Sequence, residues 1–119
     1  MKKTLVLGAS DNPARYSYLA VERLTKQQHP VVAIGRKAGM IGNTGILIDR
    51  PTIEDVDTIT LYLNEQHQKD YYDYILSLHP NRIIFNPGAE NEELLNLAKV
   101  NGIEALEACT LVMLSTGQY

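Results

Sequence analysis

Residues 4–17 read TLVLGASDNPARYS and contain the most informative pattern in the sequence. The apolar and β-branched residues 4–7 predict a short buried strand, and the small and turn-forming residues 8–14 predict a loop that ends it. From residue 15 to residue 28, apolar side chains recur at steps of three and four, which is the spacing of one face of a helix. The segment is therefore predicted to run from strand to loop to helix.

The same alternation of strand and helix continues along the chain. Hydrophobic patterns and turn signals predict further strands at residues 31–34, 58–63, 83–85 and 103–108, and helices at residues 65–78 and 92–101. Residues 35–45 contain four glycines and are predicted to form a loop. The apolar residues 46–48 fit a short additional strand, and residues 109–119 receive no assignment.

Strands that alternate with helices pair in parallel through right-handed crossovers, so the sequence predicts one α/β domain over residues 1–119. We expect a three-layer sandwich of helices, sheet and helices, with a five-stranded parallel sheet in the order 3-2-1-4-5. Ligands of such sheets bind beyond the carboxyl ends of the strands, at the point where the strand order reverses. This rule selects the loops at Gly8, Gly35, Leu63, Pro87 and Cys109.

Composition and charge narrow the classes of function. A net charge of −3 argues against a nucleic-acid-binding protein, which needs a basic face. No apolar run approaches the roughly 18 residues of a membrane span, and the apolar segment after Lys3 is too short for a signal peptide, so a cytoplasmic protein is expected. The single cysteine, Cys109, and the lack of paired Cys and His spacings predict neither a disulfide nor a metal site.

The loop at residues 8–17 has the chemistry of an anion site. Its small residues allow backbone N–H groups to approach an anion, the helix that follows offers unpaired N–H groups, and Arg15 adds a formal charge. A pyrophosphate fits such a site. The alternative is that Gly8 only turns the strand into the helix, with Ser10 or Asn12 as the cap.

The end of the second strand helps to distinguish between nucleotides. A site for NAD typically has an acidic residue here, whereas this chain has Gly35, Arg36 and Lys37. Two cations favour a phosphorylated ribose, which occurs in NADP and in coenzyme A, and the pattern does not choose between them. The alternative is a basic loop that is simply solvated.

Three motifs in order, at residues 8–17, 86–91 and 109–112, resemble the small stand-alone CoA-binding-domain proteins. These proteins are similar to the nucleotide-binding amino-terminal domain of the α subunit of succinyl-CoA synthetase. The resemblance covers nearly the whole chain and implies a Rossmann-like fold, with CoA phosphates at the loop of residues 8–17 and the ribose phosphate near Arg36 and Lys37. The chain departs from the family around the second strand, where an Asn-Pro-Lys turn is common.

The residues predicted to bind the cofactor come from four loops, and none is predicted to be catalytic. They are Gly8, Ala9, Ser10, Asn12, Arg15, Tyr16, Ser17, Gly35, Arg36, Lys37, Pro87, Gly88 and Cys109. The phosphorylated histidine of the synthetase belongs to a second domain that this sequence does not contain. Cys109 either approaches the thiol of CoA or is a small buried apolar side chain.

We expect a protein that binds CoA or an acyl-CoA without catalytic activity of its own. An NADP-dependent reductase subunit and a protein-interaction or regulatory module remain as alternatives. Tyr71 and Tyr74 share a helical face, which indicates contacts in the core or in a homodimer rather than base stacking. Asn64 is predicted to cap the helix that follows it. Glu90 and Asn91 either cap the next helix, which we favour, or face the ligand.

Overall fold

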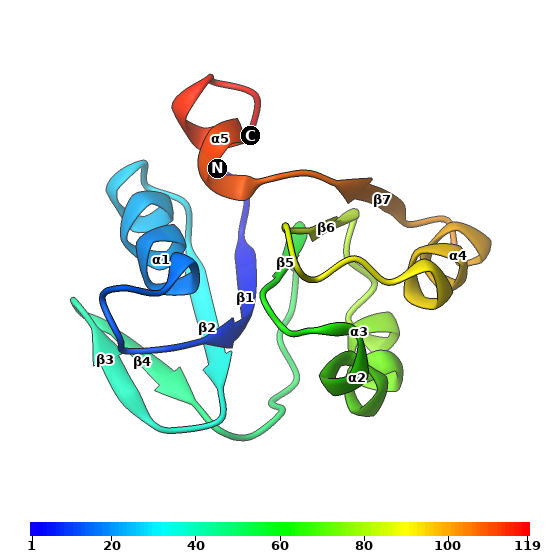
Figure 1. Ribbon diagram of the computed structural model, residues 1–119, viewed down its shortest axis with the longest axis horizontal. Coiled ribbons are helices and arrows are strands. Elements are labelled where there is room, and N and C mark those ends of the chain that lie inside the picture. The colour runs from blue at the N-terminus through cyan, green and yellow to red at the C-terminus, as the bar shows by residue number, and fades with distance from the viewer.

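The computed structural model describes residues 1–119 and contains a single seven-stranded sheet in the order β3-β4-β2-β1-β5-β6-β7 (Figure 1). All neighbouring strands pair in parallel except β3 and β4, which form an antiparallel hairpin at one edge. The strands are β1 (Thr4–Ala9), β2 (Val31–Gly35), β3 (Gly39–Ile41), β4 (Thr44–Leu47), β5 (Thr58–Leu61), β6 (Arg82–Phe85) and β7 (Glu104–Glu107).

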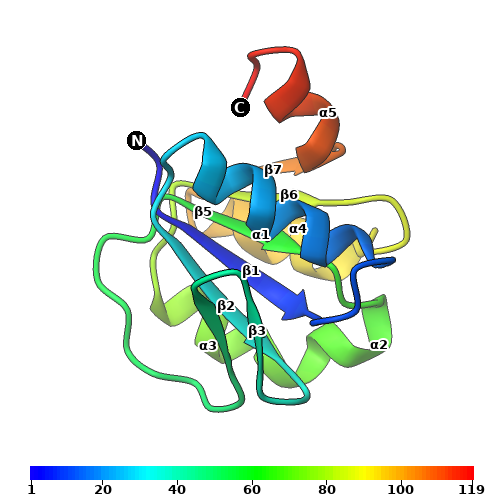
Figure 2. The same ribbon diagram turned by 90° about the vertical axis from the view of Figure 1, so that its left-hand side faces the viewer.

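Helices cover both faces of this sheet, so the predicted three-layer α/β sandwich is confirmed (Figures 1 and 2). One face carries α1 (Tyr16–Lys26) and α5 (Thr110–Ser115), which pack on each other. The other carries α2 (Glu65–Gln68), the 3₁₀ turn η1 (Lys69–Tyr71), α3 (Tyr72–Ser77) and α4 (Glu92–Val100).

Side chains along the central strands point alternately to the two faces of the sheet, and each face has its own hydrophobic core. In β1, Leu5 and Leu7 pack with Ile75 of α3 and Leu94 of α4, whereas Val6 packs on the opposite side with the helix α1. Leu5, Val6 and Leu7 are all fully buried. Successive residues of a strand point to opposite faces, so a strand that is apolar throughout must be covered on both sides.

The expected sheet of five parallel strands is wrong in number and in orientation. Residues 35–45, which were predicted to be a loop, contribute β3, and β4 follows at once after a two-residue turn. Gly42 in this turn has a φ of +58°, which suits glycine, and the side chains of Ile41 and Ile46 are buried against α1. Counted along the chain without β3, the six parallel strands lie in the order 3-2-1-4-5-6, with β4 as the third strand. The predicted order 3-2-1-4-5 therefore holds for the first five of these strands, and β7 is an additional sixth strand at the edge.

Two other segments differ from the prediction. The helix expected at residues 65–78 is divided into α2, η1 and α3, and the unassigned tail contains α5. Asn64 and Asn91 accept hydrogen bonds from the backbone N–H groups of His67 and Leu94, which confirms both predicted caps. No helix has the length and apolar character needed to cross a membrane.

Candidate functional site

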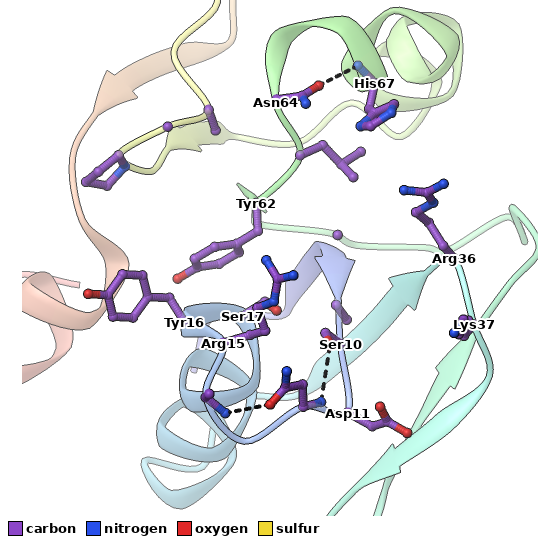
Figure 3. A pocket seen from close by; sticks show the side chains of 18 residues that line it. Ser10, Asp11, Arg15, Tyr16, Ser17, Arg36, Lys37, Tyr62, Asn64 and His67 are labelled. Atoms are coloured by element: carbon purple, nitrogen blue, oxygen red, sulfur yellow. Dashed lines mark hydrogen bonds between the residues drawn. The ribbon is translucent and has the colours of Figure 1, made fainter.

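A cavity of about 1140 Å³ lies at the carboxyl ends of β1, β2, β5 and β6 (Figure 3). Its volume is large enough for an extended nucleotide, since pockets for small ligands usually span roughly 300–1,000 Å³. Four segments supply the 18 lining residues, which are Gly8, Ala9, Ser10, Asp11, Asn12, Ala14, Arg15, Tyr16, Ser17, Arg36, Lys37, Tyr62, Leu63, Asn64, His67, Pro87, Gly88 and Ala89.

Gly8 turns the chain from β1 into the floor of this cavity. Its φ is +100°, a conformation that other residues rarely adopt, and a Cβ atom at this position would lie 2.9 Å from the carbonyl carbon of Tyr62. Both the backbone conformation and the space therefore require glycine. The close approach of the two backbones brings the loops after β1 and β5 together at one cavity.

The loop after Gly8 is held by its own polar side chains. The Ser10 hydroxyl accepts a hydrogen bond from the Asn12 backbone N–H at 3.1 Å, and the Asn12 side chain accepts one from the Ala14 N–H at 3.0 Å. The Arg15 N–H donates to the Asn12 carbonyl at 3.0 Å. Three short-range bonds fix the path of the loop before any ligand is bound, which lowers the entropic cost of binding.

The helix α1 begins at this loop with its first N–H groups free of side-chain partners. Its N-cap residue, Arg15, makes no capping hydrogen bond, and its first turn contains no acidic residue. By contrast, α4 has Asn91 as its cap and two glutamates in its first turn. Unpaired N–H groups and the positive end of the helix dipole both favour an anion at the start of α1.

Three cations surround the cavity. Arg15, Arg36 and Lys37 are exposed and line it, and none of their side chains donates a hydrogen bond to a protein acceptor. Asp11 is the one acidic residue in the lining, and its carboxylate lies against Gly39 in β3 and points away from the centre (Figure 3). The cavity is therefore electropositive although the whole chain carries a net charge of −3.

The turn at Pro87 and Gly88 forms the opposite wall. Gly88 has a φ of +91°, and its backbone N–H donates to the carboxylate of Glu90 at 2.9 Å. Because this N–H group already has an anionic partner, the turn is a poorer site for a phosphate than the start of α1. We expect it to contact an uncharged part of a ligand.

Residues 2–115 match a family described as CoA binding domain. The chain belongs to this family. The match covers almost the whole sequence, supports a CoA-binding role, and is consistent with the predicted similarity to the CoA-binding domain of succinyl-CoA synthetase.

Several solved structures are similar in fold to this CoA-binding domain. A crystal structure of an uncharacterized protein is 55% identical, covers 100% of this chain and 98% of its own, and superimposes with a TM-score of 0.98. A hypothetical protein from Pyrococcus horikoshii OT3 is 17% identical, with coverage of 97% and 82% and a TM-score of 0.86. A protein from Thermus thermophilus is 20% identical, with coverage of 99% and 90% and a TM-score of 0.86. At these low sequence identities, the last two structures show only that the fold is similar. No curated protein matches the sequence.

The structure brings eleven of the thirteen predicted residues of the CoA-binding domain to one cavity and places Gly35 and Cys109 outside it. A Cβ atom on Gly35 would lie 2.2 Å from the carbonyl oxygen of Ala9, so this glycine is required for the close pairing of β2 with β1. Cys109 is half-buried and precedes α5 as its N-cap residue. Cys109 does not line the cavity, and the approach of a ligand thiol to it stays a prediction.

Seven lining residues were absent from the predicted set. They are Asp11, Ala14, Tyr62, Leu63, Asn64, His67 and Ala89. The rule that ligands lie beyond strand ends selects the loop at Leu63, but nothing in the sequence shows which of its side chains face inward. The Tyr62 ring lines the cavity while its hydroxyl is buried without a hydrogen-bond partner, and this burial raises the pKa of Tyr62.

Tyr71 and Tyr74 have structural contacts, as their helical spacing indicates. Tyr71 and Tyr74 are half-buried against the core, and Tyr74 donates to the carbonyl of Pro51 at 2.7 Å. The Arg50 guanidinium lies 3.9 Å from the centre of the Tyr71 ring. Neither ring lines the cavity of the CoA-binding domain.

Proposed function

We propose that this CoA-binding domain holds CoA or an acyl-CoA in the cavity at the carboxyl edge of the sheet and has no catalytic activity of its own. The observation that carries the proposal is the uncapped start of α1, which opens into a cavity lined by three cations. Family membership supports the choice of CoA over other phosphorylated nucleotides.

The pyrophosphate of CoA fits the loop of residues 8–17. Here the free N–H groups of the first turn of α1, the small residues 8–10 and the Arg15 guanidinium converge on one region (Figure 3). Ser17, in the same turn, is almost fully buried and lines the cavity, so its hydroxyl is available as a further donor. Backbone donors at a helix start combined with a cation are the usual chemistry for binding a pyrophosphate.

The phosphate on the ribose of CoA fits Arg36 and Lys37. Both follow the carboxyl end of β2, next to the loop that would hold the pyrophosphate. No acidic residue stands at this strand end to accept hydrogen bonds from an unmodified ribose. The pair therefore favours CoA over dephospho-CoA and NADP over NAD.

The arrangement of nucleophiles and bases supports binding rather than catalysis. His29 contacts Tyr119 and His79 lies by a separate cavity at the amino ends of the strands, which leaves His67 as the histidine of the site. The Ser10 hydroxyl is bonded to Asn12, and no hydrogen bond joins the His67 ring to Ser10 or Ser17. Nucleophilic catalysis requires a base within hydrogen-bond reach of the nucleophile.

Calorimetric titration and thermal unfolding with CoA, dephospho-CoA, acetyl-CoA, NADP and NAD test the proposal. A ligand at 100 times its dissociation constant should add roughly 2.7 kcal/mol to the free energy of unfolding. Arg15→Ala should weaken CoA binding by roughly ten- to a hundredfold, since a charge-assisted hydrogen bond contributes about 1.5–3 kcal/mol. Arg23→Ala, on the last turn of the same helix, is the matched control and should leave the affinity unchanged.

The same titrations separate the alternatives. Arg36→Ala should reduce the affinity for CoA more than the affinity for dephospho-CoA, because only CoA has the ribose phosphate. Binding of NADP alone would support the reductase subunit, which the pair Arg36 and Lys37 also fits. Stabilisation by none of these ligands would contradict the proposed function and favour a protein-interaction module. Release of free CoA thiol from acetyl-CoA would contradict the absence of catalysis.

A further inference from the structure

The side chain of Gln68, at the end of α2, is fully buried and connects two walls of the cavity. Its amide nitrogen donates to the carbonyl oxygen of Leu63 at 2.8 Å and to the carbonyl oxygen of Ala89 at 2.7 Å. Leu63 belongs to the loop after β5, and Ala89 belongs to the turn after β6. Both residues line the cavity, whereas Gln68 does not.

A second amide fixes the orientation of the first. The oxygen of the Gln68 amide accepts a hydrogen bond from the Asn91 side-chain nitrogen at 2.9 Å. That nitrogen also donates to the Tyr72 hydroxyl at 2.8 Å, and the Asn91 oxygen accepts from the Leu94 N–H at 3.2 Å. Every donor of both amides has a partner, so the NH₂ group of Gln68 must face the two carbonyl oxygens.

Nothing in the backbone duplicates this connection. The pairing of β5 with β6 ends at Leu61 and Phe85, and no backbone hydrogen bond joins residues 62–64 to residues 86–91. Beyond the last paired residues, side-chain amides connect the two strand ends. The Asn86 amide donates to the Leu61 carbonyl at 2.9 Å, and the Gln68 amide joins the two loops farther from the sheet. The separation of the two cavity walls therefore depends on the bonds of Gln68.

We infer that Gln68 is a positioning residue that sets the separation of the Leu63 and Ala89 loops and thereby the affinity of the cavity for its ligand. Its effect on affinity rests on the proposed function, but its effect on the loops does not. Removal of the NH₂ group leaves two buried carbonyl oxygens without donors, which favours movement of the loops toward water.

Gln68→Met tests the inference because it keeps the length of the side chain and removes the amide. The control is Thr58→Val, which removes an equally buried hydrogen-bonding group at the amino end of β5, where Thr58 accepts from Arg82 at 2.7 Å. In the absence of ligand, amide hydrogen exchange should accelerate at residues 61–64 and 86–90 in Gln68→Met and not in Thr58→Val. Equal exchange in the two variants at these residues would overturn the inference.

Titration with CoA gives the second measurement, at a temperature where both variants are folded. Gln68→Met should raise the dissociation constant by roughly tenfold, which corresponds to about 1.4 kcal/mol, while Thr58→Val should leave it unchanged. If the wild-type protein binds no CoA, the proposed function fails and the exchange measurement still decides the role of Gln68. Faster loop exchange with unchanged CoA affinity would overturn the link to the ligand.

Gln68→Glu serves as a second variant of nearly the same shape. A carboxylate here would face two carbonyl oxygens in a buried position, so its pKa should rise and its protonated form should be favoured. The protonated acid retains one donor, and the ionised acid has none. The ratio of its CoA dissociation constant to that of the wild type should therefore be larger at about pH 8 than at about pH 5.5. A ratio that does not change with pH would count against the inference.

Discussion

At the scale of single residues, Gly8 has the strictest requirement in the cavity, because conformation and space both exclude a side chain. Gly8→Ala should reduce the free energy of unfolding by about 3 kcal/mol, since a non-glycine residue at positive φ costs about 1–3 kcal/mol and the clash with the Tyr62 backbone adds to it. Urea unfolding at neutral pH measures the loss.

Gly42 provides the control for this substitution. It also has a positive φ, of +58°, but nothing lies within 4 Å of the position that a Cβ atom would occupy. Gly42→Ala should therefore cost only about 1 kcal/mol, the cost of the conformation alone. Equal losses in the two variants would show that the contact with Tyr62 is not the dominant cost.

The sequence predicts the part of the site that is contiguous and not the part that folding assembles. Residues 8–17 could be identified because the small residues, the helix start and Arg15 are adjacent along the chain. Tyr62 and His67 enter the cavity from another loop and from α2, and their inward direction depends on how that helix packs. Gly35 was selected for its place at a strand end, yet its role is the close contact with Ala9.

At the scale of secondary-structure elements, the two asparagine caps differ in what else they bind. The Asn64 side chain caps the exposed start of α2 and makes no other hydrogen bond, whereas the Asn91 side chain caps α4 and also donates to Gln68 and Tyr72 in the interior. Asn64→Ala should cost about 1 kcal/mol of stability. Asn91→Ala should cost about 2–4 kcal/mol, because it also leaves the buried Gln68 oxygen without a donor.

Thermal unfolding of the two variants beside the wild type measures this difference. Asn64→Ala is the matched control, since it removes the same cap chemistry from a shorter and more exposed helix. Similar losses of stability in the two variants would show that the interior bonds of Asn91 contribute little.

The elements that the sequence predicts well are those with an uninterrupted hydrophobic pattern. The strands β1, β2 and β6 and the helices α1 and α4 lie where the pattern places them. The fit of residues 46–48 to a short strand corresponds to β4, but β3 and its antiparallel pairing were missed because a segment with four glycines at residues 35–45 is typical of a loop. Ile41 and Ile46 nevertheless anchor the hairpin to α1. The helix expected at residues 65–78 is broken directly after Gln68, whose side chain bonds to two loops that the local sequence does not reveal.

At the scale of the whole molecule, segments from both ends of the chain meet at the amino edge of the sheet, opposite the cavity (Figure 2). The Tyr119 hydroxyl is hydrogen-bonded to the Thr4 hydroxyl at 2.6 Å, and its ring lies 4.3 Å from the Arg82 guanidinium and 5.0 Å from the His29 ring. We call this packing of Tyr119 against Thr4, Arg82 and His29 the closure at Tyr119. The sequence predicts the three layers but not this closure, because residues 109–119 have no pattern that indicates where they pack.

This closure makes the stability of the protein depend on pH through His29. The Nδ1 atom of His29 accepts a hydrogen bond from the Lys2 backbone N–H at 3.1 Å, so the neutral ring is the form that fits. Burial, together with the positive charges of the Met1 amino group, Lys2 and Arg82, lowers the pKa of His29 below its ordinary value of 6.5. The unfolded chain therefore binds more protons than the folded protein in this range.

The free energy of unfolding should consequently fall as the pH is lowered from about 7.5 to about 5.5, and the contribution of His29 should be fully present only above its unfolded pKa. His29→Gln removes the titrating group and should make this dependence shallower. His67→Gln is the control, because His67 is exposed and lies at the opposite edge of the sheet, and it should keep the wild-type slope. Urea unfolding at several pH values measures all three proteins. A slope for His29→Gln that equals the wild-type slope would show that groups other than His29 govern the pH dependence, and that the closure at Tyr119 tolerates a charged imidazole.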